Sequence, residues 1–173
     1  FSWGDPRRES TLGELVAAVE GCCAAAAAYR APFVSGKDSL NNEYTGSDGR
    51  RHAVPPTLVI TAVAHVPDVD RCVTPVLSSP GNLVVLIGRT RAEFAGSHLD
   101  LVLGQPVDPG SVPAPDPDAP ARYRRLHQAM QDGLVQSCHD VSEGGLAVAL
   151  AELCIAGRLG AEVTELPHEN AVA

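Results

Sequence analysis

The stretch SGKDSLNNE at residues 35–43 organises the chain, because a helical pattern precedes it and strand-like patterns follow it. Residues 11–29 carry apolar side chains at the spacing of one helix face. Thr11 and Glu14 have the spacing of a capping box at its start. Residues 32–34 begin with a proline, which ends the helix, and predict a short strand. The stretch 35–43 is therefore expected to be a loop that follows this strand.

Beyond the loop, strand and helix patterns alternate. Asp48 and Gly49 form a hairpin signal. Residues 57–66 alternate and are rich in β-branched side chains, and residues 82–88 are almost wholly apolar, so both predict strands. This order predicts an α/β or α+β class with helices packed on a sheet. The remaining expected elements are helices at 121–132 and 144–156, the latter buried, and strands at 134–138 and 161–166.

Two stretches break the alternation. Residues 66–80 collect prolines and polar residues and are expected to contain a domain boundary. Residues 104–120 contain six prolines and predict an extended connector. The chain is thus expected to contain parts of two domains.

Composition narrows the function classes. The chain has 173 residues, 45% of them hydrophobic and 4% aromatic, which is typical of a globular protein with a small aliphatic core. The net charge of −8 argues against nucleic acid and against an anionic membrane as partners. The negative charge does not exclude phosphorylated ligands, because Mg²⁺ held by carboxylates can bind phosphates.

Targeting and cysteine chemistry give further expectations. We expect no membrane span and no signal peptide. The chain does not start with methionine, so we expect it to be a fragment. The five cysteines are irregularly spaced and lack zinc-site pairs, so reduced thiols in a cytoplasmic protein are expected.

The loop at 35–43 holds residues suited to phosphate and metal binding. Gly36 allows close approach of a backbone to a phosphate. Lys37 supplies positive charge, Asp38 is able to hold Mg²⁺, and Ser39 offers a hydrogen bond. The spacing is not that of a Walker A motif. Turns favour the same residue types, so an ordinary polar turn remains the alternative.

A second segment with chemical potential is HDVSEGG at residues 139–145, between an expected strand and an expected helix. Ser142 is a natural helix N-cap. Free amides at a helix start attract anions, and Asp140 is placed to hold a metal beside them. The alternative is a capped turn with tightly packed glycines. His98 lies alone among small residues, where a structural role is expected.

Together these segments resemble the phosphoribosylformylglycinamidine synthase family, in the second half of its synthetase component. The resemblance covers nearly the whole chain, and the motifs occur in the same order and at similar spacing. The motifs that carry the resemblance are residues 33–44, 54–58, 80–83, 95–98 and 139–147.

The resemblance implies a fold and an activity. Residues 1–70 would be the end of the second synthetase N-terminal-like domain. Residues 80–173 would be part of the second C-terminal-like domain, an α/β sandwich like that of aminoimidazole ribonucleotide synthetase. The full-length parent would be a cytoplasmic ligase that uses ATP and Mg²⁺ to convert formylglycinamide ribonucleotide to the amidine. Its partners would be a glutaminase subunit or domain, which supplies ammonia, and the rest of the parent synthetase.

The family's site residues carry over by position. Gly36 and Lys37 would contact the nucleotide, and Ser39 the substrate. Many members have a magnesium-binding asparagine where this chain has Lys37, so Asp38 is the expected ligand instead. Asp140 matches an aspartate that contacts magnesium in the family's first repeat. No catalytic residue is expected in this chain. The alternatives are a related ATP enzyme such as selenophosphate synthetase, or a noncatalytic interaction domain.

Overall fold

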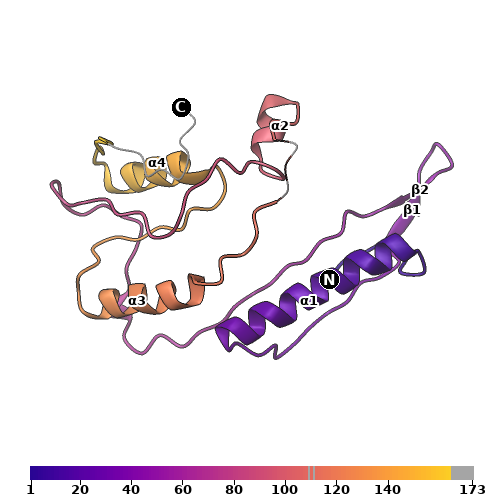
Figure 1. The fold of residues 1–173 in the computed structure, drawn as a ribbon, viewed down its shortest axis with the longest axis horizontal. Helices are drawn as coiled ribbons and strands as arrows, with labels where there is room; N and C mark the ends of the chain where they lie inside the picture. The colour runs from indigo at the N-terminus through magenta and orange to yellow at the C-terminus, as the bar shows by residue number, and fades with distance from the viewer. Residues whose placement is uncertain (109, 111, 165–173) are drawn as a thin grey trace. The chain divides into compact units, whose positions relative to one another are not determined.

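The computed structural model describes residues 1–108, 110 and 112–164. The chain divides into two compact units, residues 1–65 and residues 66–173, and each is considered by itself. Figure 1 shows the elements in chain order, and their bounds are α1 (Glu9–Tyr29), β1 (Glu43–Thr45), β2 (Arg51–Ala53), η1 (Val69–Arg71), α2 (Leu99–Leu103), α3 (Ala119–Gln131) and α4 (Gly145–Gly157).

Helix α1 confirms the helix predicted for residues 11–29, but it begins two residues earlier, at Glu9. Its N-cap is Arg8, which makes no side-chain capping bond, so the predicted capping box does not mark the start. The helix ends where Arg30 adopts a left-handed conformation, and the Arg30 amide bonds the carbonyls of Ala26 and Ala27.

Helix α1 is also long and apolar enough to cross a membrane, which differs from the sequence expectation. Its alanine-rich C-terminal half accounts for this composition. Glu14 and Glu20 lie inside the helix, where a membrane span would have to bury both carboxylates at high cost.

The first residues of unit 1 form backbone bridges to two distant segments. Ser2 is bridged to Ser39 in parallel and to Thr57 in antiparallel fashion. The Trp3 amide donates to the Ser39 carbonyl at 3.0 Å, and the Ser39 amide donates to the Phe1 carbonyl at 2.9 Å. The N-terminal segment is therefore the central strand-like element between the loop and residue 57.

Strands β1 and β2 form an antiparallel hairpin, with Tyr44 opposite His52. This confirms the turn predicted at Asp48 and Gly49. Gly49 has a φ of 73°, which favours glycine, and the Asp48 carboxylate accepts the Arg50 amide at 2.9 Å. The Tyr44 and His52 rings stack with centroids 5.2 Å apart.

Helices α3 and α4 of unit 2 confirm the helices predicted for 121–132 and 144–156. Helix α2 was not predicted, because five residues are too few to show a periodic pattern. Helix α4 ends against a second chain segment. A Cβ atom on Gly157 would lie 2.5 Å from the Leu77 carbonyl oxygen, so glycine is required for this approach.

The strands predicted at 32–34, 57–66, 82–88 and 134–138 are not formed among the described residues, and neither is the part of 161–166 before residue 165. Residues 165 and 166 lie outside the described residues. A strand needs a neighbouring backbone to bond, and these segments have only isolated contacts, such as the Cys138 amide on the Thr74 carbonyl. Most of their apolar side chains are exposed, with Val63 at 93% and Leu83 at 91%.

The prediction that α4 is buried is also wrong in this structure. Ala149 is its one buried residue among those described, and Ile155 is 76% exposed. An apolar composition indicates that a helix requires a covering surface, but it does not supply that surface within the same chain.

Gly4 provides a test of the packing in unit 1. An added Cβ would lie 2.9 Å from the Ala53 Cβ and 3.2 Å from a Glu43 carboxylate oxygen. We expect Gly4→Ala to lower the free energy of unfolding by about 1–3 kcal/mol, because overpacking strains a closed site.

The matched control is Gly13→Ala, where an added Cβ meets nothing within 4 Å. Helix propensity should make this variant about 0.5–1 kcal/mol more stable. Chemical denaturation of both variants measures the two effects, and equal shifts would contradict the packing described.

Candidate functional site

The loop at 35–43 is fixed at its C-terminal end by backbone hydrogen bonds. The Asn41 amide donates to the Gly4 carbonyl at 2.9 Å, and the Asn42 amide donates to the Trp3 carbonyl at 3.0 Å. Asn41 has a φ of 62°, a conformation that asparagine tolerates better than most residues. The loop therefore turns sharply at Asn41 before it enters β1.

Ser39 lies half-buried beside the N-terminal segment. Its hydroxyl donates to the Asn42 Oδ1 atom at 2.9 Å. The Asn42 Nδ2 atom donates to the Ser39 carbonyl at 2.6 Å and to the Ser2 Oγ atom at 3.0 Å. Three side chains thus form a small hydrogen-bonded group around the expected substrate contact.

Gly36, Lys37 and Asp38 are consecutive and exposed. A Cβ on Gly36 would meet no atom within 4 Å, so the space beside its backbone is open. Within the described parts of the chain, the side chains of Lys37 and Asp38 make no hydrogen bond or ion pair. The predicted nucleotide and metal residues of the loop therefore lie next to one another, with an exposed ammonium and an exposed carboxylate.

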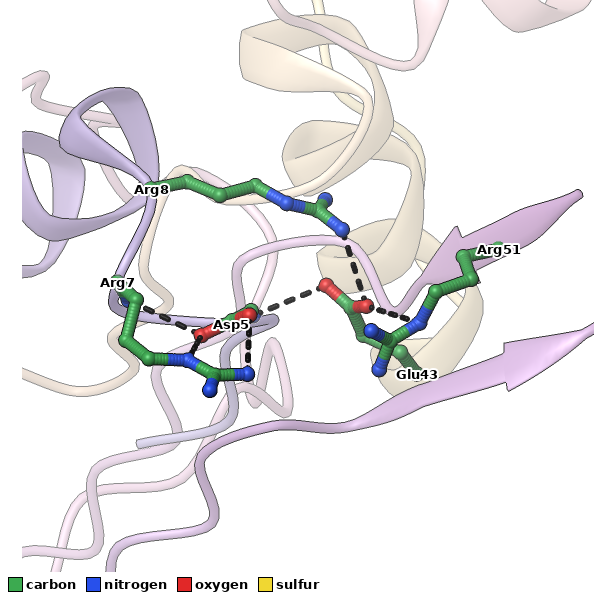
Figure 2. Close-up of polar contacts among 5 residues, drawn as sticks. All are labelled: Asp5, Arg7, Arg8, Glu43 and Arg51. Atoms are coloured by element: carbon green, nitrogen blue, oxygen red, sulfur yellow. Dashed lines mark hydrogen bonds and ion pairs between the residues drawn. The ribbon is translucent and has the colours of Figure 1, made fainter.

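Glu43 closes the loop with a carboxylate that has no exposed surface. Figure 2 shows its contacts. One oxygen accepts the Asp5 amide at 3.0 Å, and the other accepts from Arg8 at 3.1 Å and lies 3.0 Å from the Arg51 Nε atom. Burial of a carboxylate is costly unless donors satisfy it, and here both oxygens have partners. Sequence reasoning assigned no role to this residue.

Asp5 forms a second carboxylate site beside Glu43 (Figure 2). The Arg7 guanidinium binds it with two bonds of 2.9 and 2.8 Å, and the Arg7 amide adds a third at 3.0 Å. The Arg7 side chain, followed by its amide, lowers the pKa of Asp5 from 3.8 to about 2. Asp5 is therefore ionised at neutral pH.

Asp140 lies in unit 2, whereas Asp38 lies in unit 1. The Asp140 Oδ1 atom is 3.2 Å from the His139 Nδ1 atom, and His139 Nε2 is 2.8 Å from a Glu152 oxygen on α4. Hydrogen bonds from its own amide, His139 and Ser142 lower the pKa of Asp140. The hydrogen bond that the Glu152 carboxylate accepts, and then the one that Asp140 accepts, raise the pKa of His139. Asp140 is thus oriented by a histidine that α4 holds.

The turn before α4 differs from the prediction. Gly144, not Ser142, is the N-cap, and its φ of 80° favours glycine. Ser142 instead contributes its carbonyl to the Gly145 amide at 3.1 Å. In the portion of the chain with described positions, no group of three or more His, Cys, Asp or Glu side chains could hold a metal by itself.

The lowered pKa of Asp5 predicts a pH dependence of stability. Because the folded pKa of about 2 is below the ordinary 3.8, the Arg7 contact stabilises the fold above pH 3.8 and is lost as pH falls toward 2. We expect the urea midpoint of the wild type to fall between about pH 5 and about pH 2.5 by more than that of Asp5→Asn. An equal decrease of the urea midpoint in the wild type and in Asp5→Asn would contradict this assignment.

Comparison with known proteins adds independent findings. Residues 79–172 match the family model described as AIR synthase related protein, C-terminal domain. Two curated relatives are the phosphoribosylformylglycinamidine synthase subunits PurL of Limosilactobacillus reuteri, from strain DSM 20016 and from subsp. reuteri strain JCM 1112. Each is 36% identical over 164 residues, which is 94% of this chain and 21% of the relative. No solved structure matches the chain significantly.

The chain spans about a fifth of the length of the curated relatives that it matches. The family match covers more than half of the chain and implies an α/β fold, in line with the fold class predicted from the sequence. The match and the identity to both relatives confirm the resemblance found in the sequence. The chain belongs to the family of AIR synthase related proteins, through their C-terminal domain.

Proposed function

We propose that this chain forms part of an ATP-dependent ligase that makes formylglycinamidine ribonucleotide from formylglycinamide ribonucleotide and glutamine-derived ammonia. The observation that carries the proposal is the 36% identity, over 94% of the chain, to two PurL subunits whose names state this synthase activity. The loop at 35–43, with its open glycine backbone and its exposed Lys37 and Asp38, supports it. The same relatives favour this function over selenophosphate synthesis or a noncatalytic role.

In this proposal the nucleotide lies against Gly36 and Lys37. The open space at Gly36 admits a phosphate to the backbone, and the Lys37 ammonium offsets its charge. Asp38 presents an exposed carboxylate next to them. Proteins often hold Mg²⁺ by one or two carboxylates together with substrate phosphates, so this donor set fits a metal that arrives with ATP. Bound there, Mg²⁺ would stabilise the charge that develops during phosphoryl transfer.

Ser39 contacts the substrate in this proposal, and Asp140, in unit 2, is a magnesium contact considered separately from Asp38. The bond from His139 to Asp140 orients the carboxylate, as outer-shell histidines and carboxylates do for metal ligands. The partners are formylglycinamide ribonucleotide, a glutaminase subunit or domain, and the rest of the synthetase. The enzyme would act in the cytoplasm.

Asp38→Asn tests the metal contact. In the full-length protein we expect the variant to bind Mg-ATP about tenfold more weakly or worse, because metal affinity falls at least this much when even outer-shell groups are lost. The matched control is Asp70→Asn in η1, which removes another exposed carboxylate. Calorimetric titration of both variants with Mg-ATP makes the measurement. Unchanged binding by Asp38→Asn would favour a structural loop.

A second test concerns the isolated 173-residue chain. We expect it to catalyse no ATP-dependent amidine formation, because no catalytic residue is assigned within it and the chain corresponds to only 21% of each relative. The assay measures ADP released in the presence of ATP, formylglycinamide ribonucleotide and ammonia. Turnover by the isolated chain would contradict the assignment.

A further inference from the structure

The hydrogen-bond partners around Ser39 determine which atom is the donor in each bond. The Ser39 carbonyl is only an acceptor, so the side-chain atom of Asn42 that lies 2.6 Å from it must be the amide nitrogen. That nitrogen also lies 3.0 Å from Ser2 Oγ. The amide orientation of Asn42 is therefore determined by its partners, and its oxygen faces the Ser39 hydroxyl.

An asparagine oxygen has no proton to give, so the Ser39 hydroxyl must be the donor in their 2.9 Å contact. A serine hydroxyl has one proton and two lone pairs. With its proton on Asn42, Ser39 has only lone pairs left for a ligand. A phosphate oxygen is an acceptor at neutral pH, and contact with it would require Ser39 to give up the bond to Asn42.

We propose that Asn42 is a positioning residue that makes Ser39 a hydrogen-bond acceptor, so that Ser39 recognises an N–H or O–H group of the substrate rather than its phosphate. This inference rests on the proposed function and specifies the chemistry of its substrate contact. Formylglycinamide ribonucleotide carries suitable donors in its amide groups and its ribose hydroxyls. Asn42 acts only through Ser39 and does not touch the ligand.

The first experiment removes the acceptor. Ser39→Ala in the full-length synthetase is titrated with formylglycinamide ribonucleotide and with formylglycinamide riboside, which lacks the phosphate. We expect both dissociation constants to rise by about fivefold, the effect of losing one uncharged hydrogen bond. An increase for the ribonucleotide without one for the riboside would place the phosphate at Ser39 and overturn the proposal.

The second experiment tests whether Asn42 acts through Ser39. Asn42→Ala should raise the KM for formylglycinamide ribonucleotide by about threefold, with the KM for ATP and kcat unchanged. In a Ser39→Ala background the same change should have no further effect, because the group that it orients is absent. Additive effects in the double variant would overturn the positioning role.

Asn41→Gly is the matched control. It removes a neighbouring amide side chain, and glycine accepts the φ of 62° found there, so the KM for formylglycinamide ribonucleotide should stay at the wild-type value.

If Asn42→Ala does not fold, the riboside comparison with Ser39→Ala still decides whether Ser39 donates or accepts in its contact with the substrate. A wild-type protein that binds no formylglycinamide ribonucleotide would refute the proposed function, and this inference with it. That outcome is distinct from the two variant results above.

Discussion

The buried carboxylate of Glu43 is the contact on which the described part of unit 1 depends. It joins the backbone of Asp5, the start of α1 at Arg8 and the hairpin at Arg51. The two arginines remain about half exposed, so part of their charge stays solvated while the carboxylate itself is enclosed. Loss of this one acceptor would leave a buried amide unsatisfied, which costs more than the hydrogen bond itself contributes.

The loop at 35–43 is fixed toward its C-terminal end. Gly36 to Asp38 are exposed, whereas Ser39 and Asn42 are held to the N-terminal segment by paired backbone and side-chain bonds. The loop therefore combines an open half with a fixed half. An arrangement of this kind suits a ligand whose charged end is met by accessible groups and whose uncharged part is met by oriented ones.

Features encoded locally were predictable from the sequence. Periodicity gave α3 and α4 to within about two residues, and the Asp48-Gly49 pair gave the hairpin. Partners far apart in the chain were not predictable. Nothing in the pattern of residues 57–66 or 82–88 states which backbone would pair with them, and nothing near Glu43 indicates that Asp5 lies against it. The roles proposed for Gly36 to Ser39 rest on their residue chemistry and on resemblance to a family, and the orientation of Asn42 required coordinates.

The pairing of residue 2 with residue 39 has a consequence for the order of folding. The bonds that shape the loop join positions 35 to 40 residues apart, so the intervening chain must first be closed into a ring at an entropic cost. Helix α1 forms through hydrogen bonds between residues close in sequence, and it contains most of the residues between positions 2 and 39. Its formation therefore shortens the flexible part of the chain that must be closed. We therefore expect the bonds between residues 2 and 39 to form after the helix that lies between them.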